Sequence, residues 1–230
     1  MAEYYSFILA AGRGSRMGTD DPKQYLLLNN RPVVWHSINS LYAHNKIKKV
    51  IVLLSPDDKY FKCYDWSEFH DKLLIVHCGG ETRAETVLNG LNFTKNLILD
   101  DDWVLVHDAV RPCLDYSSLN RLINEVDDIH GGILAVPVVD TLKKSNGDKT
   151  ILSTTSRENL WRAQTPQMFK YKTLMDSHCN IDPVEITDES SAVEKLGLSP
   201  RLVLGHEFNI KITYPEDLNC AAINLQKLYG

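Results

Sequence analysis

The chain carries SFILAAGRGSRMG at residues 6–18, followed by PKQY at residues 22–25. The apolar start predicts a buried strand, and the small residues and glycines after it predict a loop. Such a loop lets backbone N–H groups approach phosphate oxygens closely, because no Cβ atoms stand in the way. It is not a dinucleotide fingerprint, which requires glycine where Met17 stands, and it lacks the Gly-Lys-Ser/Thr of a Walker A loop. The stretch therefore predicts a phosphate-binding loop of another kind at the end of a strand.

Two cations, Arg16 and Lys23, frame this loop. Either one alone would be interpreted as a solvated surface residue, and a lone Gly-x-Gly is more often a plain turn. Two cations beside a glycine loop suit a polyphosphate, whose charge must be neutralised when a phosphoryl centre is attacked. We therefore predict that Arg16 and Lys23 are catalytic.

Short apolar runs alternate with amphipathic stretches, which is the pattern of a mostly parallel sheet covered by helices. The predicted strands span residues 4–9, 49–54, 74–78, 103–107, 132–136 and 202–204. The predicted helices span residues 33–45, 82–90, 117–127, 189–196 and 215–228. No repeat or composition break marks a second domain, so we expect a single domain over residues 1–230.

Residues 140–157 depart from this alternation because they are polar almost throughout. Asn146-Gly147 is a strong turn signal, and residues 150–152 can return as a strand. From the residues alone an exposed hairpin is the favoured interpretation. An arm that reaches a partner subunit is the alternative.

The composition, with 43% hydrophobic and 24% charged residues, is that of a globular protein. A net charge of -5 argues against a general nucleic-acid binder, so local Lys and Arg must hold any anionic ligand. The apolar runs are too short to span a membrane, and residues 1–5 do not resemble a signal peptide. Five scattered cysteines without a Cys-x-x-Cys pair favour reduced thiols. We expect a cytoplasmic protein without a nucleic-acid or membrane partner.

Further motifs follow the glycine loop in a fixed order. They are VHDAVRP (106–112), DTLK (140–143), QTPQ (164–167), TDE (187–189) and NIKIT (209–213). Together with the loop and PKQY they resemble the 2-C-methyl-D-erythritol 4-phosphate cytidylyltransferases, which are CTP-using enzymes of the non-mevalonate isoprenoid pathway. The resemblance runs from residue 8 to about residue 218.

The resemblance implies a Rossmann-like α/β nucleotidyltransferase fold, with a mostly parallel twisted sheet flanked by helices. It implies transfer of the CMP moiety of CTP to 2-C-methyl-D-erythritol 4-phosphate, giving 4-diphosphocytidyl-2-C-methyl-D-erythritol and pyrophosphate. It also implies a homodimer in which residues 140–157 form a protruding β-arm that helps close the partner's active site. The implied cofactor is Mg²⁺ or another divalent cation.

The predicted nucleotide site joins the glycine loop to the segment GGETRAET at residues 79–86. Backbone groups and short polar side chains can read a base because its edges have a fixed donor and acceptor order. By resemblance the nucleotide-binding residues are Ala10, Ala11, Gly12, Gly14, Gly80, Glu81 and Thr86. The family usually has Asp and Ser where this chain has Glu81 and Thr86, so the carboxylate and the hydroxyl are kept. Thr82-x-x-Glu85 also matches a capping box.

The predicted acceptor site centres on Asp108 and Lys211. Asp108 ends a buried-looking strand, where a carboxylate can hold Mg²⁺ on nucleotide phosphates or simply cap a helix. Residues 208–213 alternate like a strand, which would put Asn209, Lys211 and Thr213 on one face. We predict Lys211 to be catalytic, Asp108 and Asn209 to bind the metal, and His107 to be structural. By resemblance the acceptor-binding residues are Asp108, Arg111, Thr141, Arg157, Thr165, Thr187 and Lys211.

Two other functions remain open on the sequence. A ribitol 5-phosphate cytidylyltransferase is the nearest alternative, favoured slightly by Glu85-Thr86 and by residues 208–213. Residues 131–143 and 160–166 favour the isoprenoid enzyme instead. A non-catalytic nucleotide-binding protein is the remote alternative, and it would be expected to have lost Arg16, Lys23, Asp108 or Lys211.

Overall fold

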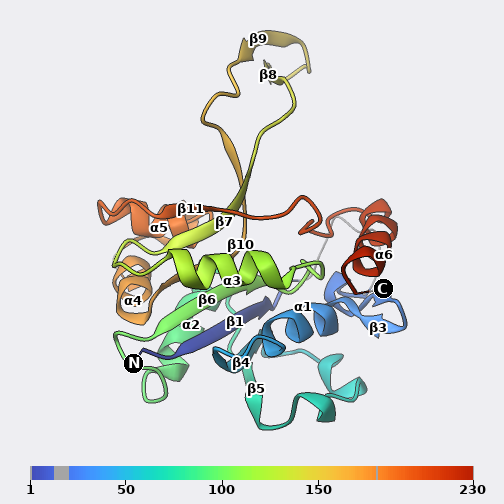
Figure 1. The fold of residues 1–230 in the computed structure, drawn as a ribbon, viewed down its shortest axis with the longest axis vertical. Helices are drawn as coiled ribbons and strands as arrows, with labels where there is room; N and C mark the ends of the chain where they lie inside the picture. The colour runs from blue at the N-terminus through green and yellow to red at the C-terminus, as the bar shows by residue number, and fades with distance from the viewer. Residues whose placement is uncertain (1, 13–20, 180, 230) are drawn as a thin grey trace.

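A seven-stranded sheet forms the centre of the computed structural model, which describes residues 2–12, 21–179 and 181–229 (Figure 1). The strand order is β11-β7-β10-β6-β1-β4-β5. The strands are β1 (Tyr4–Ala10), β4 (Ile47–Leu54), β5 (Leu73–His77), β6 (Trp103–Asp108), β7 (Gly132–Pro137), β10 (Trp161–Lys170) and β11 (Arg201–Leu204). β10 runs antiparallel to β6 and β7, and the other neighbouring strands are parallel.

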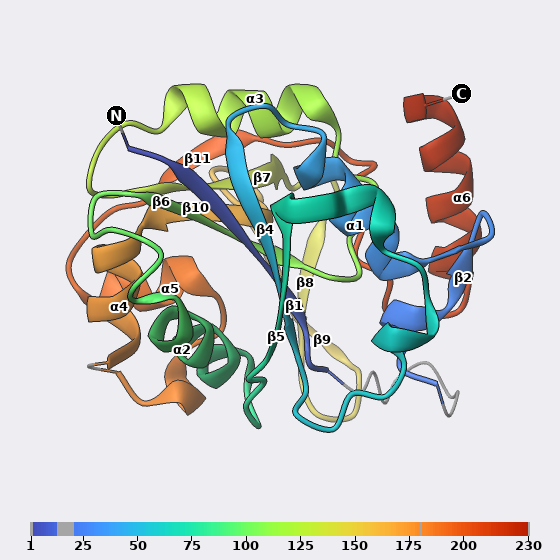
Figure 2. The same ribbon diagram turned by 90° about the horizontal axis from the view of Figure 1, so that it is seen from below.

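Helices cover both faces of this sheet (Figure 2). They are α1 (Val33–Tyr42), α2 (Arg83–Thr94), α3 (Tyr116–Glu125), α4 (Tyr171–Cys179), α5 (Glu189–Lys195) and α6 (Glu216–Tyr229). The apolar sides of α1 and α3 pack on one face, and those of α2, α4 and α5 pack on the other. α6 lies at the end of the sheet, where Ala221 and Leu225 pack against Val110 and Ile212.

The central strand β1 is buried on both sides. Phe7 belongs to the apolar cluster on the α2 side and Ile8 to the cluster on the α1 side, and both are fully buried. A parallel strand covered on two faces reads as a continuous apolar run, which is why residues 6–9 show no alternation. Covering both faces leaves the carboxyl ends of the parallel strands as the edge at which loops gather.

A hairpin projects away from this layered body (Figure 1). It consists of β8 (Leu142–Ser145) and β9 (Ile151–Thr155), which pair antiparallel around an exposed turn. The hairpin predicted for residues 140–157 is therefore present. A smaller hairpin, β2 (Leu27–Leu28) with β3 (Arg31–Pro32), lies before α1.

Apart from the strand-like stretch at residues 208–213, the strands and helices predicted from the sequence are present, with boundaries shifted by a few residues. The small β2–β3 hairpin and two larger elements, β10 and α4, were not predicted. β10 carries the polar residues of QTPQ and a proline, which hid its strand character, and α4 is short and weakly apolar. Both lie between the predicted strand at residues 132–136 and the predicted helix at 189–196.

The strand predicted over residues 208–213 is wrong. There the backbone N–H of Asn209 donates to the carbonyl oxygen of His206, and that of Ile210 donates to Phe208. The backbone therefore forms a turn here, and the N–H of Ile212 donates to the carbonyl oxygen of Val110, outside the segment. Asn209 and Lys211 consequently do not share a strand face.

Candidate active site

The largest concentration of predicted site residues lines a pocket of about 650 Å³. It opens where β1, β4, β5 and β6 end, which is where ligands bind in open α/β sheets. Its lining comprises residues from the four strand ends together with Lys23, Gln24 and Lys211. The remaining lining residues lie at these strand ends, in the loops after them and in the first turn of α2: Leu9, Ala11, Gly12, Ser55, Pro56, Asp57, Gly79, Gly80, Glu81, Thr82, Arg83, Thr86, Asp108, Ala109 and Val110.

Gln24 fastens the beginning of the glycine loop. Its buried side-chain amide donates to the carbonyl oxygens of Ala10 at 2.9 Å and Gly12 at 3.0 Å. The neighbouring Lys23 ammonium lies 3.0 Å from the carbonyl oxygen of Ile212. Two segments far apart in the sequence are thus tied at one edge of the pocket. The predicted site residues Gly14 and Arg16 lie outside the described residues.

Gly79 lets the two nucleotide loops approach each other. A Cβ atom at this position would lie 2.4 Å from the Cβ of Ala11 and 3.0 Å from the carbonyl oxygen of Leu54. Real Cβ contacts are not this short, so any larger residue must push the loops after β1 and β5 apart. A side chain on Gly80 would meet Glu85 in the same way, at 2.5 Å.

The predicted capping box at the start of α2 is present. The hydroxyl of Thr82 accepts from the backbone N–H of Glu85, whose carboxylate accepts from the backbone N–H of Thr82. Thr86 is buried, and its hydroxyl accepts from the N–H of Gly80 at 3.1 Å and donates to the carbonyl of Thr82 at 3.0 Å. The two hydrogen bonds of Thr86 therefore hold the predicted base-reading loop against the start of α2. The side chain of Glu81 is exposed and lines the pocket.

Asp108 is the meeting point of three cations. The ammonium of Lys211 lies 2.9 Å from its carboxylate. The Nε atoms of Arg83 and Arg111 each lie 3.5 Å from a carboxylate oxygen. Burial alone would raise the pKa of the Asp108 carboxyl, but Arg83, Lys211 and Arg111 outweigh it and hold that pKa well below its usual range. Asp108 is therefore ionised at neutral pH although its side chain is only 9% exposed.

A hydrogen-bonded chain beneath Asp108 fixes its backbone. The N–H of Asp108 donates to the hydroxyl of Thr165 at 3.0 Å, and that hydroxyl lies 2.9 Å from Nδ1 of His107. Nε2 of His107 lies 3.1 Å from the carbonyl oxygen of Arg111, which can only accept, so Nε2 carries the hydrogen and Nδ1 accepts from Thr165. Burial lowers the pKa of His107 to about 4, so the ring is neutral at physiological pH. This arrangement gives His107 a structural place.

The other predicted acceptor residues are distributed unevenly. Asp108, Arg111, Thr165 and Lys211 are in direct contact as one group. Thr141 and Arg157 lie instead at the base of the arm, where the Arg157 guanidinium donates to the carbonyl oxygen of Val139. Thr187 is exposed, its N–H donates to the Ser191 hydroxyl, and it is not among the lining residues of this pocket.

Sequence reasoning missed Arg83. It lines the pocket, contacts Asp108 and pairs with Glu189 at the start of α5. Both residues fall inside motifs that were noted, GGETRAET and TDE, but nothing local indicates that the two side chains meet across 106 positions. The one available signal was that Glu189 lies in a family motif at the start of a predicted helix.

The donor groups present fit a divalent cation that arrives with a phosphate. Asp108 offers carboxylate oxygens, and the buried Oδ1 of Asn209 has no hydrogen-bond partner among the described residues. Oxygen ligands of these kinds suit Mg²⁺. Within the described ranges, however, no group of three His, Cys, Asp or Glu residues is placed to hold a metal.

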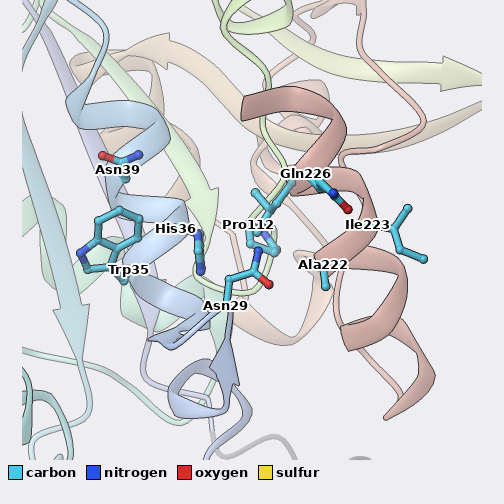
Figure 3. A pocket seen from close by; sticks show the side chains of 9 residues that line it. Asn29, Trp35, His36, Asn39, Pro112, Ala222, Ile223 and Gln226 are labelled. Atoms are coloured by element: carbon cyan, nitrogen blue, oxygen red, sulfur yellow. The ribbon is translucent and has the colours of Figure 1, made fainter. Parts of the chain in front are cut away.

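A second pocket, of about 580 Å³, lies between α1 and α6 (Figure 3). In Figure 3, Trp35, His36 and Asn39 come from α1, Ala222, Ile223 and Gln226 come from α6, and Pro112 and Asn29 lie between the two helices. Its lining residues are Asn29, Trp35, His36, Asn39, Pro112, Ala222, Ile223, Leu225 and Gln226. None of these described residues is a lysine, arginine or carboxylate, so this pocket has no group that neutralises a polyphosphate.

The fold and the first pocket together define an α/β nucleotidyltransferase. Residues 5–227 match the family model of 2-C-methyl-D-erythritol 4-phosphate cytidylyltransferase. A relative of that name from Dechloromonas aromatica is 48% identical over 98% of this chain and 99% of its own length. One from Nitrosospira multiformis is also 48% identical, with the same coverage.

Solved structures agree with these relatives. A 4-diphosphocytidyl-2C-methyl-D-erythritol synthase superimposes with a TM-score of 0.86 at 36% identity, over 98% of this chain and all of the other. The cytidylyltransferase of Francisella tularensis gives a TM-score of 0.81 at 34% identity, over 97% of this chain and all of the other. The chain belongs to the 2-C-methyl-D-erythritol 4-phosphate cytidylyltransferase family. The predicted fold class, family resemblance and enzyme class are confirmed.

Among the described residues, no helix is both long and apolar enough to cross a membrane.

Replacing Gly79 by alanine tests the close approach of the two loops. The added Cβ would overlap Ala11 and the Leu54 carbonyl, so we expect a loss of about 1–3 kcal/mol in the free energy of unfolding. Gly147→Ala is the matched control because nothing lies within 4 Å of its Cβ position. Urea denaturation measures the free energy of unfolding of both variants, and equal values for the two would contradict the loop geometry.

Proposed function

We propose that the chain transfers the CMP moiety of CTP to 2-C-methyl-D-erythritol 4-phosphate, giving 4-diphosphocytidyl-2-C-methyl-D-erythritol and pyrophosphate. Membership of the family supports this reaction. The observation that carries it is the convergence of Lys211, Arg83 and Arg111 on Asp108 beside two glycine-containing loops. A triphosphate and a second phosphate can be brought together only where cations offset their repulsion.

The proposed step is an in-line attack by an oxygen of the acceptor phosphate on the α-phosphorus of CTP. A new P–O bond forms, the bond to the oxygen that bridges to the β-phosphate breaks, and pyrophosphate leaves with that electron pair. The acceptor phosphate is already anionic at neutral pH, so no side chain has to remove a proton. Catalysis then consists of positioning and charge neutralisation.

Several residues are proposed to share the positioning and the charge neutralisation. Lys23 lies at the glycine-loop side of the pocket, where it neutralises charge on the CTP phosphates, and Arg16 is proposed to act with it. Lys211 also lines the pocket, beside Asp108 and with a side chain that is 40% exposed, and it is proposed to hold the acceptor phosphate. Gly80, Ala11 and the backbone near them are proposed to read cytosine.

A divalent cation such as Mg²⁺ is the proposed cofactor. Bound to the nucleotide phosphates, it would supply further neutralisation of negative charge. Asp108 and Asn209 are the residues proposed to hold it. Asn209 does not line the pocket, and its amide N–H donates to the carbonyl oxygen of Thr165 at 2.8 Å, so its Oδ1 is the atom available for this role.

The first test compares acceptors. Pyrophosphate release is measured with CTP and Mg²⁺, using methylerythritol phosphate and ribitol 5-phosphate in parallel. We expect a clear preference for methylerythritol phosphate and loss of activity when EDTA removes the metal. A preference for ribitol 5-phosphate would overturn the acceptor assignment while keeping the chemistry. Release with neither acceptor would overturn the proposed reaction.

We also propose a cytoplasmic homodimer in which the arm completes the partner's site. The arm and the residue before it expose apolar side chains, namely Val139, Ile151 and Leu152, each more than 60% exposed in the single chain. Exposed apolar groups on a projecting hairpin suit burial against a second copy. Thr141 and Arg157 belong to this arm. In the dimer they would reach the acceptor site of the partner.

Mixing two inactive variants tests the arm. Lys211→Ala impairs the pocket, and Arg157→Ala impairs the arm. If Arg157 acts in the partner's site, each mixed dimer contains one intact site, so random mixing restores about a quarter of wild-type pyrophosphate release. Sedimentation of the wild type should give twice the 26.1 kDa mass of the chain. No recovery on mixing, or a monomeric mass, would contradict the proposal.

A further inference from the structure

We propose that Arg83 and Glu189 are positioning residues for this reaction: Glu189 holds the Arg83 guanidinium, and Arg83 fixes the Asp108 carboxylate in the pocket. The inference rests on the proposed function, and it adds two residues to the site that act through Asp108. The proposed role is one of geometry, because the two side-chain hydrogen bonds of Arg83 both go to Glu189.

The contact between Arg83 and Glu189 is a two-point one. Both terminal nitrogens of the guanidinium donate to Glu189, one to each carboxylate oxygen, the second at 2.8 Å. Two parallel N–H···O bonds fix the plane of the guanidinium as well as its position. The Nε atom of the same guanidinium lies 3.5 Å from Oδ1 of Asp108. Glu189 therefore determines the position of the Arg83 guanidinium relative to the Asp108 carboxylate.

Glu189 is itself held rigidly. Its side chain is fully buried at the first position of α5. The preceding Asp188 caps the helix by accepting from the N–H of Ser191 at 2.9 Å. Gln167 of β10 donates to Asp188 at 2.8 Å and accepts from the N–H of Ser190 at 2.9 Å. Since β10 pairs with β6, which carries Asp108, the start of α5 and the reaction centre share one frame.

The three cations around Asp108 differ in their freedom. Arg83 is committed to Glu189, and Arg111 donates to the carbonyl oxygen of Asn209, with a side chain only 12% exposed. Lys211 is the more exposed cation, and its contact with Asp108 is the shortest of the three. Lys211 can thus move to an incoming phosphate, while Arg83 and Arg111 continue to hold Asp108.

A purely structural role is the competing explanation, in which the pair only docks α5 onto α2. Replacing one partner of a buried ion pair leaves the other charge uncompensated and destabilises the protein for that reason alone. Replacing both partners by apolar residues of similar size often restores stability. An apolar pair therefore separates the two roles, because it can recover docking but cannot hold a carboxylate.

The experiment compares Glu189→Gln, Arg83→Met/Glu189→Met and Glu185→Gln with the wild type. Glu185 is the matched control because it is a largely exposed glutamate near α5 that pairs with Lys195, away from Asp108. We expect kcat to fall about tenfold or more in Glu189→Gln, because a displaced Arg83 would no longer hold Asp108 in the geometry that the reaction needs. In Glu185→Gln it should stay within about twofold of the wild type. The double variant should recover thermal stability but keep the low kcat.

Two outcomes would overturn the inference: wild-type kcat in Glu189→Gln, or wild-type kcat in the double variant once its stability has recovered. An NMR readout is independent of turnover and of the double variant's folding. The Arg83 Nε–H signal should be seen in the wild type and Glu185→Gln but move or vanish in Glu189→Gln, and an unchanged signal there would also overturn the inference. An inactive wild type would instead refute the proposed function, and the NMR result would still decide whether Glu189 holds Arg83.

Discussion

The attraction of three cations to one buried carboxylate is the constraint on which this site depends. Asp108 ends β6 in the middle of the sheet, and its charge is kept by Arg83, Arg111 and Lys211. Without that carboxylate the three cations would repel one another at the same place. With it, a pocket in an acidic protein presents local positive charge, which two phosphates need in order to meet. The negative charge of the whole chain is therefore no obstacle to binding anions.

The remainder of the fold brings distant segments to this carboxylate. The parallel strands end at one edge, so the loops after β1, β5 and β6 converge without long connections. Gln24 ties the glycine loop to the Lys23 segment, and Gly79 allows the next loop to approach Ala11 closely. The antiparallel β10 supplies Thr165 beneath the backbone of Asp108. Strands and helix ends thus position the site residues, and the cations among these residues line the pocket.

Much of this arrangement could be predicted because the signals are local. A strand followed by glycines, a carboxylate at a strand end and a capping box each depend on neighbouring residues, and all three were found where expected. Contacts between distant residues could not be predicted in this way. Arg83 meets Glu189 across 106 positions, and the alternation of residues 208–213 suggested a strand that the turn at Asn209 prevents. A long-range contact decided the first case, and backbone hydrogen bonds within a turn overrode the alternating pattern in the second.

The central claim is that the ionised carboxylate of Asp108 organises the reaction centre. The most direct measurement is the single-turnover rate of pyrophosphate release by Asp108→Asn and by the wild type, at saturating CTP, Mg²⁺ and methylerythritol phosphate. Asparagine keeps the shape but removes the charge that aligns the cations. We expect a rate lowered by about 100- to 1,000-fold in a variant that remains folded. A rate within about threefold of the wild type would contradict the claim.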